Sequence, residues 1–267
     1  MPLAVCATPI GNLEDVTLRV LRELAEADLV LCEDTRHTRG LLERHGIKAR
    51  LLSYHEHNEA KRTAEVLPRL EAGERVALVS DAGLPGINDP GARLIAAARE
   101  AGVPVTVLPG PSAVETALVT SGLVSERYQF VGYLPRGERA LLELGEELAR
   151  WPWSVVAFES PQRLPRSLGV LARVAPDRPA AVCRELTKRF EEVAVGTVTE
   201  LAERFVEAPK GEVTLVFGPA LVAGADESAA TAAVTQLVEA GLPRRQAAEV
   251  VSGLTGVARN RLYRTSL

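Results

Sequence analysis

The apolar positions of the first hundred residues follow two alternating patterns. Short continuous apolar runs predict buried strands, and segments with apolar residues three or four positions apart predict helices. Strands that alternate with helices favour βαβ crossovers and a largely parallel sheet. The predicted strands are residues 3–7, 28–33, 75–80 and 103–110, and the predicted helices are residues 16–27, 39–46, 58–72 and 89–101.

The second half of the chain keeps an α/β pattern, but strands become more frequent in it. We predict strands at residues 127–134, 153–160, 179–186 and 212–218, and an antiparallel hairpin partner at residues 191–198. A stretch rich in small and polar residues at 219–228 is the best linker candidate, and helices follow it. The predicted organisation is an N-terminal α/β domain (1–112), a second α/β domain (113–222) and a small helical C-terminal domain (223–267).

The composition is that of an ordinary globular protein, with 46% hydrophobic and 25% charged residues among 267. No apolar run approaches the ~20 residues that cross a membrane, and the N-terminal sequence lacks the pattern of a secretory signal. The three cysteines are scattered, which favours a reducing compartment over a disulfide framework. We therefore expect a cytoplasmic protein without a membrane contact.

Charge is distributed unevenly along the chain, although the net charge is only −4. Residues 160–190 contain seven Lys and Arg against two Asp and Glu, and residues 243–267 contain five against one. Local basic patches of this kind suit a nucleic acid partner. A solvated protein surface is the alternative explanation.

Three loops that leave predicted strand ends are rich in Gly and Pro: ATPIGN (7–12), SDAGLPGINDPG (80–91) and LPGPSA (108–113). In parallel α/β sheets, ligands bind beyond the carboxyl ends of the strands. Carboxylates such as Asp81 would repel a phosphate and suit a ribose hydroxyl, an amino group or a cation. Neither a P-loop nor a GxGxxG motif occurs, and each loop taken alone could be an ordinary βα turn.

Charged residues also cluster at 32–42, 53–59 and 184–192. The pair His55 and His57 has acidic neighbours, but no third ligand is specified by spacing, so we predict no metal site. The stretch RELTKRFEE (184–192) directly follows a predicted strand. It is interpreted as either a functional cluster or a surface charge network.

Eight motifs, in order, resemble those of the ribosomal RNA small-subunit methyltransferase I family, within the tetrapyrrole-methylase-like group of S-adenosylmethionine enzymes. The resemblance implies two α/β domains of the tetrapyrrole-methylase type with the methyl donor in the cleft between them, and a homodimer. It implies 2′-O-methylation of a cytidine ribose in 16S ribosomal RNA, near the decoding site. The motifs are TPIGNLEDVT (8–17), EDTRHTRGLL (33–42), HEHNE (55–59), SDAGLPGINDPG (80–91), LPGPSA (108–113), FES-PQR (158–163), RELTK (184–188) and KGEVTLV (210–216).

The same resemblance implies a set of residues around S-adenosylmethionine. The family commonly has threonine where this chain has Leu84, so a hydroxyl contact at that position is not expected here. The implied donor-binding residues are Pro9, Gly11, Ser80, Asp81, Ala82, Gly83, Ser112, Ala113, Glu159, Glu212 and Val213.

For catalysis, the sequence suggests that Lys188 or Glu185 lies by the 2′-hydroxyl. As a base, Lys188 would need a lowered pKa, which a neighbouring arginine could provide. Asp34, Arg36 and His37 are expected to orient the nucleotide.

The tail resembles a helix-turn-helix, with a helix from about Pro243, a turn at Thr255-Gly256 and a second, arginine-bearing helix after it. A helical cap packed on the body is the alternative. Bases of RNA often stack on aromatic side chains, although most of the aromatic candidates are expected to lie in the core. These candidates are Tyr54, Tyr128, Phe130, Tyr133 and Phe158.

Two rival functions remain open from the sequence. A sister enzyme of the same group could methylate a tetrapyrrole carbon, although the basic tail and the charged clusters disfavour it. A non-catalytic RNA-binding protein of the same fold is the second alternative, and it would have no need of the methyl donor.

Overall fold

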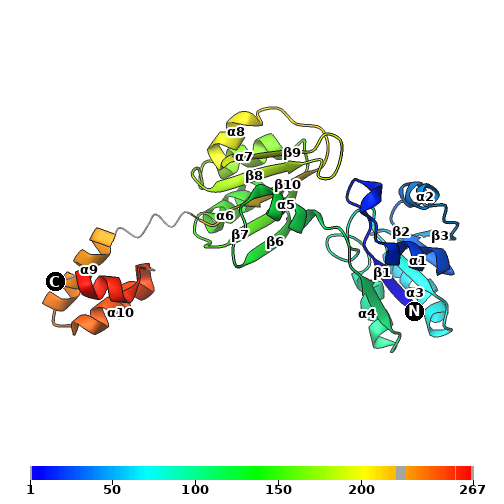
Figure 1. The fold of residues 1–267 in the computed structure, drawn as a ribbon, viewed down its shortest axis with the longest axis horizontal. Helices are drawn as coiled ribbons and strands as arrows, with labels where there is room; N and C mark the ends of the chain where they lie inside the picture. Colours follow the sequence, from blue (N-terminus) through cyan, green and yellow to red (C-terminus); the bar gives the residue numbers. More distant parts are fainter. Residues whose placement is uncertain (1, 221–226, 256, 266–267) are drawn as a thin grey trace.

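A computed structural model describes residues 2–220, 227–255 and 257–265. It contains two five-stranded sheets, each with its own helices, and a group of C-terminal helices (Figure 1). The predicted α/β class and the helical tail are therefore confirmed.

The first sheet is parallel throughout and has the strand order β3-β2-β4-β1-β5. Its central strands are wholly buried, as expected for a parallel sheet with helices on both faces. The sequence did not predict β3, which has three partly buried residues at the sheet edge. The strands are β1 (Leu3–Cys6), β2 (Leu29–Cys32), β3 (Leu51–Ser53), β4 (Val76–Val79) and β5 (Val105–Leu108).

Helices α1 (Leu18–Glu26) and α2 (Thr35–Arg44) pack on one face of this sheet, and α3 (Glu59–Glu71) and α4 (Ala92–Glu100) pack on the other. Two predicted helix starts need correction. Helix α2 begins four residues earlier than predicted, because Asp34 caps it by accepting from the backbone N–H of Arg36 at 2.8 Å.

Helix α4 begins three residues later than predicted. Asp89 and Pro90 stay in the preceding loop, and Gly91 precedes the helix with φ of 139°, a backbone conformation that favours glycine. The loop from β4 to α4 is consequently longer than predicted and leaves Asp89 outside the helix.

The second sheet has the order β6-β7-β10-β8-β9. Its β6 and β7 are parallel, whereas its other neighbouring pairs are antiparallel. The predicted hairpin at residues 191–198 is confirmed, because β8 and β9 pair antiparallel over six residues each. The strands are β6 (Tyr128–Tyr133), β7 (Ser154–Glu159), β8 (Pro179–Arg184), β9 (Glu192–Thr197) and β10 (Val213–Phe217).

Helices α6 (Glu138–Leu148), α7 (Leu164–Leu171) and α8 (Val198–Arg204) cover one face of the second sheet with a leucine-rich core. Helix α5 (Ala113–Ser121), the first element after the first sheet, packs on the other face. The division of the chain at residue 112 stays a prediction.

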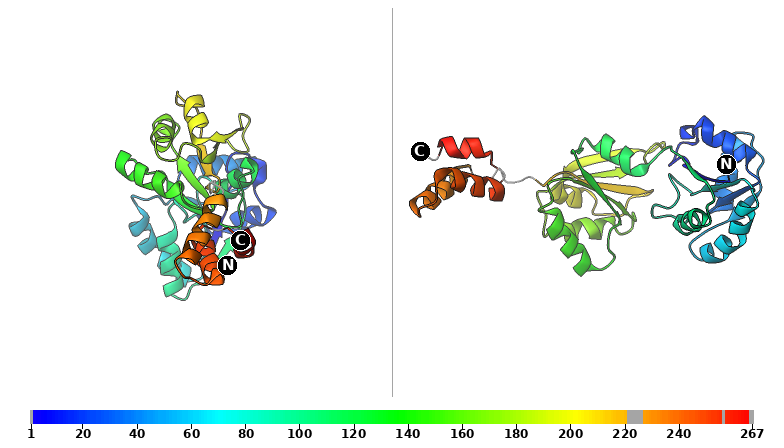
Figure 2. Two further views of the ribbon diagram at one scale, coloured as in Figure 1. Left: turned by 90° about the vertical axis from the view of Figure 1, so that its left-hand side faces the viewer. Right: turned by 90° about the horizontal axis from the view of Figure 1, so that it is seen from below.

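The C-terminal helices α9 (Glu227–Glu239), α10 (Arg244–Thr255) and α11 (Arg259–Thr265) pack around their own small apolar cluster. They lie apart from both sheets in Figure 1 and in the right-hand view of Figure 2. The predicted turn includes Gly256 and the predicted linker includes residues 221–226, which lie outside the described residues. Within the described ranges, every helix is too short or too polar to cross a membrane.

Candidate functional site

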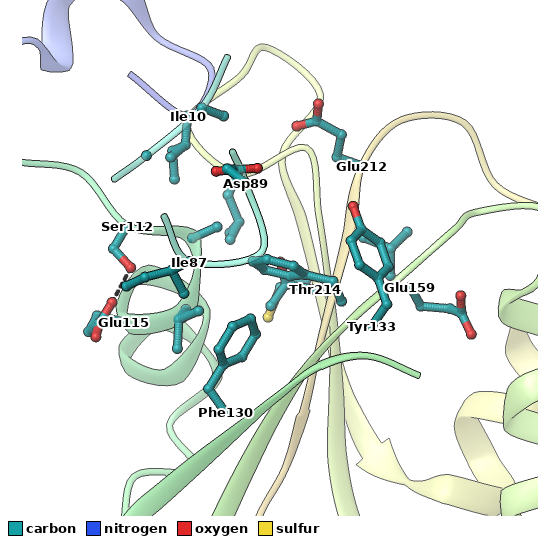
Figure 3. Close-up of a pocket in the computed structure, with 18 of the residues that line it drawn as sticks. Ile10, Ile87, Asp89, Ser112, Glu115, Phe130, Tyr133, Glu159, Glu212 and Thr214 are labelled. Carbon is teal, nitrogen blue, oxygen red and sulfur yellow. Dashed lines mark hydrogen bonds between the residues drawn. The ribbon is translucent and has the colours of Figure 1, made fainter. Parts of the chain in front are cut away.

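A cavity of about 660 Å³ lies between the loops of the first sheet and the α5-bearing face of the second sheet (Figure 3). The loop between β4 and α4 and the start of α5 contribute one side, and β6, β7 and β10 contribute the other. Pro9, Gly11 and Ser80 do not line it. Eight of the residues implied for donor binding do line it: Asp81, Ala82, Gly83, Ser112, Ala113, Glu159, Glu212 and Val213.

Hydrogen bonds join two of the glycine-rich loops to each other. The backbones of Thr8 and Gly83 exchange hydrogen bonds of 2.8 and 3.1 Å, and Thr8 Oγ1 donates to the carbonyl of Ser80 at 3.0 Å. Ser80 is buried, and its hydroxyl donates to the carbonyl of Ala82 at 3.2 Å. Thr8 and Ser80 thus fix the loop that presents Asp81 and Gly83 to the cavity.

Three carboxylates, of Glu33, Asp81 and Asp89, form an acidic wall of the cavity. Burial, followed by the charge of Glu33, raises the pKa of Asp89 to about 6. Burial and the charge of Asp81 likewise raise the pKa of Glu33. Like charges held together in this way favour a cationic or hydroxyl-bearing ligand.

Aromatic rings form the opposite wall. The Phe158 ring packs edge-on against Phe130 at a centroid distance of 4.9 Å and against Tyr133 at 5.6 Å. Figure 3 shows Tyr133 beside the opening, with Glu212 above it and Asp89 across from it. Most of the aromatic candidates were expected to lie in the core. Tyr133 does not, because it is 61% exposed.

The predicted catalytic residue Lys188 lies just outside the cavity lining. Its ammonium donates to the carboxylates of Glu185 at 2.9 Å and Glu212 at 3.0 Å. Burial lowers the pKa of Lys188, but these two hydrogen bonds outweigh burial and raise the pKa above its ordinary value. The expectation of a lowered pKa at this position needs correction, because Lys188 faces carboxylates instead of arginines.

The loop that bears Lys188 contacts the loop after β1 directly. The backbone N–H of Asn12 donates to Thr187 Oγ1 at 3.0 Å. A Cβ at Gly11 would lie 2.8 Å from the carbonyl oxygen of Leu186 and 2.5 Å from Lys188 Cγ. Gly11 therefore permits a close approach of the two loops, although it does not face the cavity.

Asp34, Arg36 and His37 also lie outside the cavity lining. Besides capping α2, the Asp34 carboxylate forms an ion pair with Arg36, and these contacts hold its pKa well below the usual range. Its backbone N–H donates to Asp81 Oδ1 at 3.1 Å. Asp34 thus orients a residue of the acidic wall, whereas the Arg36 side chain is 86% exposed to solvent.

Glu159 lines the cavity, but its buried carboxylate is engaged elsewhere. It accepts from Ser167 Oγ and from the backbone N–H of Ser160, and it pairs with Arg163. Figure 3 shows it directed away from Tyr133. At the position where threonine is common, Leu84 lines the cavity and packs against the apolar core beside the first sheet.

Sequence reasoning missed several lining residues. Glu33 and Asp89 occur in the recognised motifs, but their spacing does not reveal which carboxylates of a loop face inward. In the structure Ser112 donates a hydrogen bond to Glu115, three residues later, a contact that the sequence alone does not reveal. The missed lining residues include Ile10, Glu33, Ile87, Asp89 and Glu115. In the described part of the chain, no three His, Cys, Asp or Glu side chains gather as a metal site requires.

Comparison with known proteins gives a consistent relationship. The family described as tetrapyrrole (corrin/porphyrin) methylases matches residues 2–202. A protein of Mesorhizobium japonicum, named ribosomal RNA small subunit methyltransferase I, is 44% identical over 99% of this chain and 91% of its own length. A protein of the same name from Micromonospora olivasterospora is 45% identical over 98% of this chain and 85% of its own length.

Solved structures share the fold at lower identity. Uroporphyrin-III C-methyltransferase from Thermus thermophilus, in a complex with S-adenosyl homocysteine, aligns with a TM-score of 0.57 at 21% identity over 81% of this chain and 96% of its own. Diphthine synthase aligns with a TM-score of 0.63 at 16% identity, over 81% and 89% of the two chains. With two sheets of this fold and near full-length relatives, the chain belongs to the tetrapyrrole methylase family and, within it, to the ribosomal RNA small subunit methyltransferase I proteins.

Proposed function

We propose that this protein transfers a methyl group from S-adenosylmethionine to the ribose 2′-hydroxyl of a cytidine in 16S ribosomal RNA, near the decoding site. The observation that carries the proposal is the cavity between the two sheets, with its acidic and aromatic walls, in a chain whose near full-length relatives carry the small-subunit rRNA methyltransferase name. The donor would supply an electrophilic methyl group on a sulfonium.

The cavity residues fit this donor. The acidic wall suits a sulfonium, an amino group and ribose hydroxyls, and the rings of Phe130 and Phe158 suit an adenine. The turn at Gly83, with φ of 77°, brings backbone groups to the cavity surface. The residues that would hold the donor are Asp81, Ala82, Gly83, Ser112, Ala113 and Val213, with Glu212 at the opening.

The acceptor hydroxyl must lose a proton when its oxygen takes the methyl group. We assign the proton to the Asp89 carboxylate, which lies in the cavity and has a pKa close to the working pH. The protonated Lys188, held by Glu185 and Glu212 beside the opening, supplies positive charge next to the oxygen.

The basic surfaces are assigned to RNA. The exposed side chains of Arg259 and Arg264 lie on α11, and Arg244 stacks on the ring of Tyr263 with a distance of 4.9 Å to its centroid. Arginines on a small helical unit apart from the catalytic body suit contacts with RNA phosphates.

The active form is proposed to be a homodimer. On the α5-bearing face of the second sheet, Val119 is 71% exposed and Val195 is 54% exposed. Val195 pairs with Ala181, a core residue beneath α5, so both valines lie on the same face. An exposed apolar face of this kind suits a subunit interface. Light scattering at micromolar concentration tests it, and a monomer mass would contradict it.

Calorimetry and a labelled methyl-transfer assay test the function. We expect S-adenosylmethionine to bind and its methyl group to enter 30S subunits that lack the modification. Asp81→Asn should weaken donor binding about 10-fold through loss of a charged hydrogen-bond acceptor, whereas the exposed Asp177→Asn should not change it. Transfer to a precorrin and not to 30S subunits would favour the tetrapyrrole alternative. RNA binding without donor binding would favour a non-catalytic protein.

A further inference from the structure

A second, smaller cavity of about 460 Å³ opens next to the donor cavity. Tyr133 and Ser160 line both cavities, so the two are adjacent. We call this second cavity the arginine groove. It is lined by Tyr133, Leu134, Arg136, Ser160, Arg163 and Arg166.

The arginine groove has an excess of positive charge. Among its described lining residues there is no carboxylate. Arg166 Nη2 lies 3.9 Å from Glu138, which already accepts from Arg173 at 2.6 Å. Arg136 is exposed and has no ion pair within the described residues. Arg136 and Arg166 are therefore available to an anionic ligand.

Arg163 is the fixed member of the groove. Its Nη2 donates to the carbonyl of Leu134 at 3.2 Å and pairs with the buried Glu159. Its Nη1 is buried and has no hydrogen-bond partner in the described structure. A buried donor without a partner is unfavourable, and an oxygen of a bound ligand would satisfy it.

Tyr133 stands at the boundary between the two cavities. One side of its ring is held by the edge-on contact with Phe158, and the residue is 61% exposed. An exposed ring with a fixed orientation is a surface on which an unpaired base stacks.

We propose that the arginine groove binds the nucleotide that adjoins the methylated one, with its phosphate on Arg136 and Arg166 and its base on Tyr133. The inference rests on the proposed function, because it takes the target ribose to be in the first cavity. Adjacent cavities, one for the donor and the target ribose and one for the neighbouring nucleotide, fit a continuous single strand. The groove would thus align the target ribose with the methyl donor.

The test compares Arg136→Ala/Arg166→Ala with Arg22→Ala/Arg139→Ala. Each double variant removes two exposed arginines, and those of the second lie on α1 and α6 outside both cavities. We would measure the affinity for unmodified 30S subunits as a function of salt, the affinity for S-adenosylmethionine, and the KM and kcat of methyl transfer.

We expect the groove variant to raise the KM for 30S subunits about 10-fold or more while donor affinity stays within about 2-fold of wild type. The slope of log affinity against log salt should become less steep by about 0.7, the value for the one phosphate contact that is lost. The proposal would be overturned if the groove variant lost no more RNA affinity than the control variant and its salt-dependence slope changed no more than that of the control.

Tyr133 provides a second measurement. Tyr133→Ala should weaken 30S binding about 10-fold, whereas Tyr133→Phe, which keeps the ring, should bind as wild type does. Equal effects of the two substitutions would overturn the stacking role. If wild-type protein methylates 30S subunits and the groove variants bind normally, the groove assignment alone fails. If wild-type protein neither binds nor methylates 30S subunits, the proposed function fails with it.

Discussion

At the scale of a single residue, burial and the nearby carboxylates of Glu33 and Asp81 control the charge of Asp89 in the donor cavity. A pKa of about 6 leaves it ionised at neutral pH and still able to accept a proton. Lys188 is the opposite case, because its carboxylate partners keep it protonated. The two side chains therefore have complementary roles beside the same opening.

The pH dependence of catalysis follows from this assignment. For wild-type protein, kcat/KM should rise with pH up to about 6 and then level off, as Asp89 becomes ionised. Asp89→Asn should remove this rise and lower kcat about 100-fold or more. If the pH profile of kcat/KM for Asp89→Asn kept the inflection near pH 6, a group other than Asp89 would accept the proton.

The raised pKa of Asp89 also predicts an effect on stability. A carboxyl group whose pKa is raised on folding contributes its full stability below the ordinary value of 3.8 and loses it as the pH rises through about 6. Asp89→Asn should therefore stabilise the ligand-free protein at pH 8 by about 1 kcal/mol, after allowance for partial exposure to solvent, and hardly at pH 4. Urea unfolding at both pH values measures this, and a destabilised variant at pH 8 would contradict the account.

Lys188 should affect methyl transfer more than donor binding. Lys188→Met removes the ammonium held by Glu185 and Glu212, and we expect kcat to fall about 10- to 100-fold. Donor affinity, measured by calorimetry, should change less than about 3-fold, and Lys188→Arg should retain more activity than Lys188→Met. Equal losses of binding and turnover, or no loss of either, would reject this role.

At the scale of secondary-structure elements, it is loops, and not helices or strands, that bring the two halves of the site together. The loop after β1 hydrogen-bonds to the loop after β4, and it also contacts the loop between β8 and β9. In the latter loop, Glu185 and Thr187 have positive φ values of 52° and 64°, which are uncommon for residues with side chains. This backbone is held in place by its contacts on both sides.

Gly11 is the residue that tests this packing. Gly11→Ala places a methyl group against the backbone of Leu186, so we expect a loss of about 1–3 kcal/mol in the free energy of unfolding and a lower kcat. The matched control is Gly40→Ala in α2, where a Cβ would have no neighbour within 4 Å, and it should be neutral or slightly stabilising. Similar unfolding curves for both variants would mean that the two loops are not closely packed in solution.

The elements also show what the sequence could and could not predict. The apolar patterns predicted the strands other than β3, the helices α1 to α4 and the helical tail, whereas α5, α6, α7 and α8 were not predicted. The start of α4 was placed wrongly because Asp89-Pro90 is a good helix-start signal, but the positive φ at Gly91 ends the loop later. β3 was missed because three partly buried residues give no pattern.

The same limit applies to the site. The loop residues 81–83 and 112–113 line one cavity, as expected because glycine-rich turns after parallel strands meet at one sheet edge, whereas their role in binding the donor stays a prediction. The pairing of Lys188 with Glu212, 24 positions later, could not be predicted, since it depends on how β8 and β10 lie side by side. The same holds for Arg163, whose contacts depend on the end of β6.

The whole molecule separates three tasks in space. The first sheet supplies the acidic wall, the second sheet supplies the aromatic wall and the arginine groove, and the C-terminal helices carry basic residues apart from both (Figure 2). A small donor would occupy the cavity between the first two units, whereas a large RNA would extend over the groove and the tail. This division suits an enzyme with one small and one very large substrate.

The most direct test of the central claim is to map the transferred methyl group. Unmodified 30S subunits would be incubated with the protein and S-adenosylmethionine carrying an isotopic methyl label, and the nucleosides of 16S ribosomal RNA would be analysed by mass spectrometry. The account predicts label on the ribose of a single cytidine near the decoding site. Label on a base, label spread over many nucleotides, or no label in the RNA would contradict it.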